Sequence, residues 1–222
     1  MTALAHRAFP IVLAAPSGTG KTTIARRLVE SDPVFVFSVS ATTRPRRTGE
    51  VEAKDYTFVA REAFQEMAAS GDLCEWAEVH GHLYGTPRRY LEEATERGQH
   101  VVLDIDVQGA MQMRDRVPEA VLIFVFPPSA ETLVGRLVNR ATEGSQELAR
   151  RLRNARDEMD AAGSFDYLVV NDDLERAVGQ IRELVRAETH RTSRARQLGL
   201  DVDRIRSAID RILEEGVASP RG

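Results

Sequence analysis

Short apolar runs recur along the chain, and most are followed by turn residues and then by a stretch with helical spacing. A strand buried on both faces of a parallel sheet has this uninterrupted apolar pattern. Alternation of such strands with helices is typical of a doubly wound α/β fold. We therefore expect a parallel sheet flanked by helices, with strands at residues 11–15, 34–39, 101–105, 121–126 and 167–170.

The stretches between these runs carry apolar side chains three or four positions apart, which is the spacing of an amphipathic helix. The helix expected after the first strand has Ile24 and Leu28 on one face. The helix after the last strand has the longest apolar face, made of Leu174, Val178, Ile181, Leu184 and Val185.

The pattern changes in three places, and these changes predict the domain organisation. Residues 41–99 have short mixed strands and turns, which indicates a lobe inserted into a core of residues 9–40 and 100–190. Residues 139–153 are polar and rich in Arg, and we expect an irregular flap there that acts as a lid. Residues 191–222 form a basic, helical tail, whose apolar face packs on the parent domain or on a second copy of the chain.

Composition narrows the class of protein. The 222 residues include 42 % hydrophobic and 29 % charged residues, which is ordinary for a globular domain. A formal net charge of −4 provides no global positive field, so we expect no nucleic-acid partner. No apolar run approaches the roughly 20 residues of a membrane span. Cys74 is the one cysteine, so no intrachain disulfide forms; we expect a buried core thiol and a cytoplasmic protein.

A glycine-rich segment follows the first apolar run directly, with the sequence Ala15-Pro16-Ser17-Gly18-Thr19-Gly20-Lys21-Thr22. In a P-loop, glycines let backbone N–H groups wrap a phosphate, a lysine reaches the outer phosphates, and a hydroxyl serves magnesium. Gly18, Gly20, Lys21 and Thr22 supply these groups. Ala15 replaces the usual first glycine, and it fits if its φ stays negative. The alternative is a turn that caps a helix and binds nothing.

Two carboxylates end the strand expected at residues 101–105. Asp104 and Asp106 stand at its carboxyl end, where ligands bind in open α/β sheets. Thr22 and Asp104, directly or through water, are the candidate ligands of a magnesium ion carried in with a nucleoside triphosphate. A carboxylate that only caps the next turn is the alternative.

The chain also contains an ordered series of short motifs: Ser38-Val39-Ser40-Ala41-Thr42-Thr43-Arg44-Pro45, Gly49-Glu50, Asp55-Tyr56-Thr57-Phe58, Glu75-Trp76, Tyr84-Gly85-Thr86, Leu103-Asp104-Ile105-Asp106-Val107-Gln108-Gly109 and Asn171-Asp172-Asp173. Together they resemble the guanylate kinase family over about residues 9–190. The resemblance implies a P-loop core, a GMP-binding lobe, an arginine-bearing lid, and transfer of a phosphoryl group from ATP to GMP.

The resemblance also implies roles for individual residues. It places ATP against Ala15, Pro16, Ser17, Gly18, Thr19, Gly20, Lys21, Thr22 and Thr23, with Asn171 and Asp172 near the adenine. It places GMP against Ser40, Arg44, Arg47, Tyr56, Glu75, Tyr84, Thr86 and Asp106. It assigns catalysis to Lys21, Arg44, Asp104, Arg136, Arg140 and Arg151.

These residue types suit the chemistry. Guanine offers N1–H and a 2-amino group as donors, so a carboxylate pairs with it and leaves adenine unpaired. A phosphate dianion prefers arginine forks and phenol hydroxyls. Phosphoryl transfer is catalysed by positioning and electrostatics, which lid arginines supply while they exclude water. On composition alone, Glu75 could be a solvated edge residue and Arg44–Arg47 a solvated basic turn.

Two other functions compete with this interpretation. Guanylate-kinase-like domains also serve as non-catalytic binding modules, although such modules are expected to lose the phosphate-loop lysine or the lid arginines. A P-loop kinase for another acceptor is the second alternative. Glu75, Thr86 and the expected phosphate clamp of Arg44 and Arg47 argue against it.

Overall fold

The computed structural model of the chain describes residues 7–79, 81–140, 145–194 and 198–214. The chain divides into two compact units, which are residues 8–183 and residues 1–7 with 184–222. The motifs identified in the sequence all lie in the first unit.

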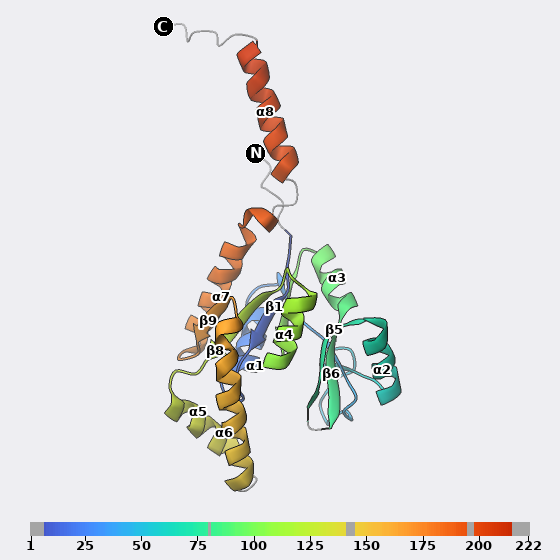
Figure 1. Ribbon diagram of the computed structural model, residues 1–222, viewed down its shortest axis with the longest axis vertical. Coiled ribbons are helices and arrows are strands. Elements are labelled where there is room, and N and C mark those ends of the chain that lie inside the picture. Colours follow the sequence, from blue (N-terminus) through green and yellow to red (C-terminus); the bar gives the residue numbers. More distant parts are fainter. Residues whose placement is uncertain (1–6, 80, 141–144, 195–197, 215–222) are drawn as a thin grey trace. The chain divides into compact units, whose positions relative to one another are not determined.

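Five strands form a parallel sheet in the first unit (Figure 1). They are β1 (Ile11–Ala14), β2 (Phe35–Phe37), β7 (His100–Asp104), β8 (Val121–Phe126) and β9 (Tyr167–Val170), in the order β2-β7-β1-β8-β9. Each neighbouring pair is parallel. The apolar runs are the strands of this sheet, so the expected α/β class is confirmed. The run at 34–39 yields a shorter strand than expected, because the chain leaves the sheet after Phe37.

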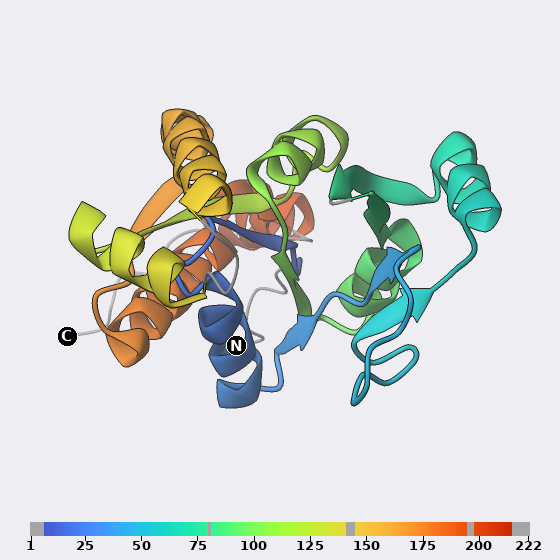
Figure 2. The same cartoon turned by 90° about the horizontal axis from the view of Figure 1, so that it is seen from below.

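Helices follow the strands as the alternation predicts. They are α1 (Lys21–Ser31), α4 (Val107–Arg116), α5 (Ala130–Arg140), α6 (Ser145–Asp160) and α7 (Leu174–Thr189). Helices α1 and α4 lie on opposite sides of the sheet (Figure 2). Asp106 caps α4 by accepting the Gly109 N–H at 2.7 Å, and Ser129 caps α5 by accepting the Thr132 N–H at 3.1 Å. These caps determine where each helix starts.

A second sheet stands beside the first and belongs to residues 40–87 (Figure 2). Its strands are β3 (Ser40–Thr42), β4 (Tyr56–Phe58), β5 (Leu73–Val79) and β6 (His82–Pro87), in the order β4-β3-β6-β5. Helices α2 (Arg61–Ser70) and α3 (Arg88–Glu96) complete this lobe. Its small core is formed by Ala41, Phe64, Leu73 and Leu83. Ser40, expected at the end of the core, is thus the first residue of the second sheet.

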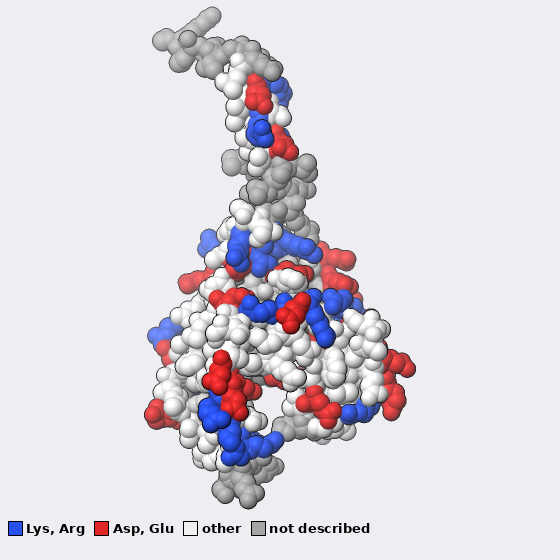
Figure 3. Space-filling model, in the orientation of Figure 1, with Lys and Arg blue, Asp and Glu red and all other residues white. Residues whose placement is uncertain are grey.

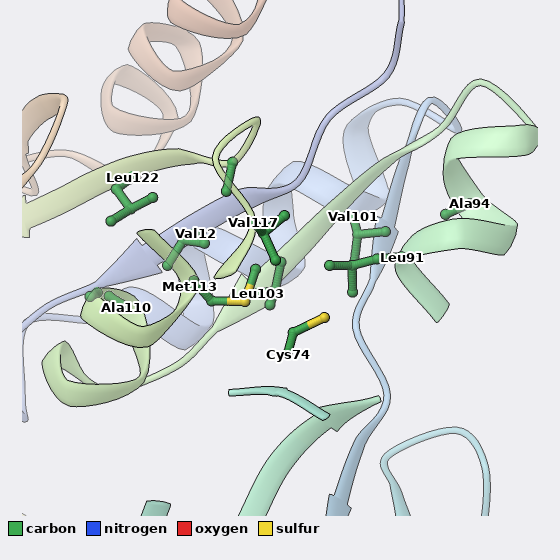
Figure 4. Packing of buried hydrophobic residues seen from close by; sticks show 12 residues of the cluster. Val12, Cys74, Leu91, Ala94, Val101, Leu103, Ala110, Met113, Val117 and Leu122 are labelled. Carbon is green, nitrogen blue, oxygen red and sulfur yellow. The ribbon is translucent and has the colours of Figure 1, made fainter. Parts of the chain in front are cut away.

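A larger apolar cluster joins the two sheets. Cys74 of β5 lies among side chains of α3, α4 and the parallel sheet, including Leu91, Leu103 and Met113 (Figure 4). The Cys74 side chain is fully buried, and burial raises the pKa of its thiol to about 11. The expected core thiol is therefore confirmed, and the cluster ties β5 to the core.

The expectation of an irregular flap at residues 139–153 is wrong for the part that the structure describes. Helix α5 continues to Arg140, and α6 begins at Ser145. Leu148, Leu152 and Ala155 of α6 pack against Leu133 and Leu137 of α5. This apolar contact stabilises a helix in a polar, arginine-rich segment.

The second unit contains the end of α7, a short 3-10 helix at Thr192–Arg194 and helix α8 (Leu198–Glu214). Glu188, which is buried, pairs with Arg191 at 3.2 Å and with Arg194 at 3.0 Å. Helix α8 exposes Val202, Ile205, Ile209 and Ile212. Within the described residues, no helix has the length and apolar character needed to cross a bilayer.

Candidate active site

The phosphate loop connects β1 to α1. Gly18 and Gly20 both have φ near +89°, a conformation that favours glycine. A Cβ at Gly20 would stand 2.6 Å from Nδ2 of Asn171, so position 20 has no room for a side chain. Ala15 is not among the described residues with positive φ, so its methyl group causes no backbone strain. Helix α1 begins at Lys21, and its first N–H groups point into the loop as an anion site.

Two side chains from distant elements hold the outer turn of this loop. Arg136 of α5 donates from Nη1 to the Thr19 carbonyl at 3.0 Å. Asn171, which follows β9, donates to the same carbonyl at 2.6 Å. The structure thus brings both predicted residues to the loop itself.

The loop encloses a cavity of about 280 Å³, which is lined by Ala15, Pro16, Ser17, Gly18, Thr19, Gly20, Lys21, Thr22, Thr23, Asp104, Asp106 and Glu158. Lys21 pairs with Asp104 at 2.9 Å and also donates to the Ile105 carbonyl. Each predicted loop residue therefore faces one space, where a lysine and a helix N-terminus provide positive charge.

The donors present fit magnesium that arrives with a nucleotide. Thr22 is exposed in the first turn of α1, and the Asp104 carboxylate faces the same cavity. Magnesium binds through one or two protein ligands together with phosphate oxygens and water. Within the described residues no three His, Cys, Asp or Glu side chains form a metal cluster of their own. The site therefore suits a nucleotide-borne ion.

A second cavity, of about 220 Å³, lies between the lobe and the core, where the parallel strand β7 ends. It is lined by Lys21, Ser40, Tyr56, Glu75, Ala77, Val79, Tyr84, Gly85, Asp104, Ile105 and Asp106. On the face shown in Figure 3, the molecule is hollowed between the α5–α6 pair and the β5–β6 hairpin, and acidic and basic side chains are interspersed around it.

Glu75 is the buried acid of this second cavity, with 4 % of its surface exposed. Its Oε1 accepts the Thr86 hydroxyl at 2.7 Å. A Cβ on Gly109 would lie 2.7 Å from its Oε2, so the carboxylate rests against the bare backbone of α4. Burial raises the pKa of Glu75 to about 7; the Thr86 hydrogen bond acts the other way, and the Asp106 charge adds to the rise. Glu75 is therefore not the solvated edge residue that its spacing allowed.

Arg44 lies beside this cavity, against the ring of Tyr56, which lines it. Its Nη2 donates to Glu50 Oε1 at 2.7 Å and its Nη1 to Glu50 Oε2 at 3.1 Å. Its guanidinium carbon lies 5.3 Å from the centroid of the Tyr56 ring. Hydrogen bonds from Arg44 and from the Arg47 backbone lower the pKa of Glu50. Arg44 is thus a buried, oriented cation and not part of a solvated turn.

Some predicted residues lie outside these contacts. Arg47 is exposed, and its backbone N–H donates to Glu50 at 2.8 Å. Asp172 is exposed and pairs with Arg176. Arg151 is half-buried on α6, and the side chain of Arg140 lies outside the described residues. The Arg47 and Asp172 side chains are therefore not among those that the structure gathers around either cavity.

One residue of the first cavity escaped the sequence analysis. Glu158 of α6 faces the phosphate loop, and its Oε2 is buried without a hydrogen-bond partner in the described part of the chain. Burial raises its pKa, whereas the Ser17 N–H and the Lys21 charge lower it. The available signal was its spacing of seven residues from Arg151, which places both on one helix face.

The two cavities meet. Lys21, Asp104 and Asp106 line both, so a group bound in one would face a group bound in the other across these three side chains. The arrangement can hold an anion on the phosphate loop and direct its end toward a ligand in the cavity that contains Glu75. Such a geometry is suited to the transfer of a group from one cavity to the other.

Comparison with known proteins shows which family the chain belongs to. The family model described as guanylate kinase matches residues 7–188. A guanylate kinase of Symbiobacterium thermophilum is 48 % identical over 184 residues, covering 83 % of this chain and 87 % of that protein. One from Syntrophotalea carbinolica is 49 % identical over 185 residues, with 83 % and 88 % covered. The crystal structure of guanylate kinase from Anaplasma phagocytophilum is 36 % identical with a TM-score of 0.72, covering 89 % of this chain and 94 % of that one. The chain therefore belongs to the guanylate kinase family.

Proposed function

We propose that this protein transfers the γ-phosphoryl group of ATP to GMP, giving ADP and GDP. The observation that carries the proposal is the meeting of the two cavities at Lys21, Asp104 and Asp106. ATP lies on the phosphate loop, and GMP lies in the cavity that contains Glu75. The shared residues then stand where the phosphoryl group passes.

The acceptor base is read by the buried end of its cavity. The Glu75 carboxylate accepts from guanine N1–H and the 2-amino group, while Thr86 holds one of its oxygens. Asp106 and Ser40 line the same cavity and offer further polar contacts to the base. Adenine has no donor at N1, so it would leave the buried carboxylate unpaired, which is costly.

The GMP phosphate binds at the other end of the cavity. Arg44, held by Glu50, lies next to Tyr56, and Tyr56 and Tyr84 line the cavity. A planar guanidinium with phenol donors matches the geometry of a phosphate. Arg47 joins this clamp by moving inward from its exposed position.

Transfer itself requires positioning and charge stabilisation and no covalent enzyme intermediate. An oxygen of the GMP phosphate attacks the γ-phosphorus, the bond to the bridging oxygen breaks, and ADP leaves with the electron pair. Lys21 neutralises charge on the donor phosphates, and Arg136, Arg140 and Arg151 close over the transferred group. Thr22 and Asp104, directly or through water, would hold Mg²⁺, which supplies positive charge to the phosphate oxygens. Asn171 keeps the phosphate loop in shape, and the Asp172 segment borders the adenine.

The test is a coupled assay of ADP formation from magnesium-ATP with GMP, AMP, CMP, UMP or water as acceptor. We expect turnover with GMP and background rates with the others. Turnover with another nucleotide would refute the assigned base readout. Binding of GMP by folded protein without turnover would favour the non-catalytic binding module.

Self-association through the tail also remains a proposal. Helix α8 exposes Val202, Ile205, Ile209 and Ile212 along its length, and an apolar face of this kind packs against a second copy in many oligomers. Sedimentation velocity of the full chain tests it, and a monomer at all concentrations would refute it.

A further inference from the structure

The strand that carries Glu75 lies at an edge of its sheet. In the order β4-β3-β6-β5, strand β5 has a strand partner on one side only. Its pairing with β6 is irregular between Leu73 and Glu75, where the register shifts. An edge strand with a register shift needs further contacts to keep one position. Neighbouring groups on its open side therefore decide where Glu75 stands.

One side chain of α4 occupies that open side. The Trp76 N–H donates to Oε1 of Gln112 at 3.2 Å, and Nε2 of Gln112 donates to the Trp76 carbonyl at 2.8 Å. A single side-chain amide thus pairs with both backbone groups of one residue, as a neighbouring strand would. Arg116, one turn further along α4, adds a weak contact of 3.5 Å to the Cys74 carbonyl. Helix α4 thus bonds the backbone of both neighbours of Glu75, Trp76 through Gln112 and Cys74 through Arg116.

The same helix also limits the Glu75 side chain. Its Oε2 lies against Gly109, where a Cβ would come within 2.7 Å, and the N–H of Gly109 donates to Asp106, the N-cap of the helix. Helix α4 therefore fixes the backbone of β5 through Gln112 and receives its carboxylate at Gly109. Since α4 follows β7 of the parallel sheet, it links the acceptor carboxylate to the sheet that carries the phosphate loop.

We propose that Gln112 is a positioning residue for the acceptor base: its two bonds to Trp76 keep the Glu75 carboxylate where guanine can donate to it. The inference rests on the proposed function. Gln112 is not a catalytic residue, because it contacts the β5 backbone and does not line either cavity. Its effect on the reaction passes through Glu75.

The test compares Gln112→Ala with Gln108→Ala, a matched change at an exposed glutamine of the same helix. Steady-state kinetics give KM for GMP, KM for ATP and kcat, and the same assay with IMP reports how strongly the 2-amino group is read. Loss of two hydrogen bonds is worth on the order of tenfold. For Gln112→Ala we expect a GMP KM about tenfold higher, an ATP KM within about twofold, and a ratio of kcat/KM for GMP over IMP reduced at least about threefold. Gln108→Ala changes none of these values.

A second variant distinguishes a positioning role of Gln112 from a general loss of folded protein. Gln112→Glu keeps an acceptor for the Trp76 N–H but sets a carboxylate oxygen against the Trp76 carbonyl, so we expect a rise in the GMP KM at least as large as that of Gln112→Ala. Equal increases in the GMP and ATP KM values, or an unchanged GMP-over-IMP ratio, would show that Gln112 has only a structural role and overturn the inference. A wild-type protein without GMP turnover would instead refute the proposed function.

Discussion

The energetic cost of the buried acid is open to direct measurement through Glu75→Gln. The Glu75 pKa is about 7 in the folded protein, against an ordinary value of 4.5. Each unit of pKa shift corresponds to about 1.4 kcal/mol, so the ionised Glu75 carboxylate reduces the free energy of unfolding by up to about 3 kcal/mol. The side chain is only 4 % exposed, so solvent screening does not reduce this figure much.

The direction of the Glu75 pKa shift determines how the stability of the protein depends on pH. Because the folded pKa lies above the unfolded one, the folded protein holds the proton more tightly, and stability from this group is fully present below about pH 4.5. That stability is lost as the pH rises through about 7. Glutamine carries no charge and still offers Oε1 to the Thr86 hydroxyl. We therefore expect Glu75→Gln to be more stable than wild type at pH 8, by up to about 3 kcal/mol, and to show little difference at pH 4.5.

The assay is thermal unfolding followed by circular dichroism at pH 4.5, 6, 7 and 8. In a protein of this size 1 kcal/mol corresponds to about 2–4 °C, so the gap in Tm should reach roughly 6–12 °C at pH 8. Glu78→Gln, on the exposed side of the same strand, is the control and should show no such trend. The same Glu75 variant should raise the GMP KM by about tenfold or more, because it loses an acceptor for the base. A gap in Tm that does not change with pH, or a less stable variant at pH 8, would refute the reasoning.

Three further changes test separate parts of the site. Lys21→Ala should lower kcat at least about 100-fold while the GMP Kd measured by calorimetry stays within about twofold, because the lysine serves the donor phosphates; an equal loss of GMP affinity would contradict this. Gly109→Ala should raise the GMP KM about tenfold, because the new Cβ displaces the Glu75 carboxylate. The control is Gly179→Ala, whose Cβ would have no atom within 4 Å; it should leave the kinetics unchanged and stabilise helix α7 by up to about 1 kcal/mol. Glu158→Gln should bind ATP about three- to tenfold more tightly in calorimetry, because it removes a negative charge from the phosphate-loop cavity, and Asp157→Asn, exposed beside it, should not.

The parallel sheet and the phosphate loop were predictable because their signals are local. An apolar run of four to six residues identifies a buried strand, and the conformations of Gly18 and Gly20 are required by the loop itself. The strand predicted at residues 34–39 is shorter, Phe35–Phe37, because the chain leaves the parallel sheet and enters the second sheet at Ser40. The apolar pattern of a segment therefore predicts that its residues are buried, but it does not predict to which of the two sheets they belong.

For helix α6, composition and apolar spacing predict different structures. Its Arg-rich sequence indicated an irregular flap, yet Leu148, Leu152, Ala155 and Met159 follow the spacing of one helix face. That face packs on α5 and outweighs the polar composition. The apolar spacing of residues 148–159 was therefore enough to predict helix α6. The position of Glu158 in the phosphate-loop cavity could not be predicted in this way, because it depends on how α6 packs against the rest of the fold.

The cations of the site are held by carboxylates and still keep donors for a substrate. Lys21 has three N–H groups, of which Asp104 and the Ile105 carbonyl take two, so one is left for a phosphate oxygen. The bonds of Arg44 to Glu50 and to a backbone carbonyl use the Nη1 hydrogens and one Nη2 hydrogen, and Tyr84 takes a further one, so one of the five N–H groups is left. Since an unpaired charge away from water would be costly, the carboxylates stabilise each cation in one orientation. Under the proposed function, substrate phosphates would add to a network that is already oriented, and little reorganisation would accompany the charge that develops during transfer.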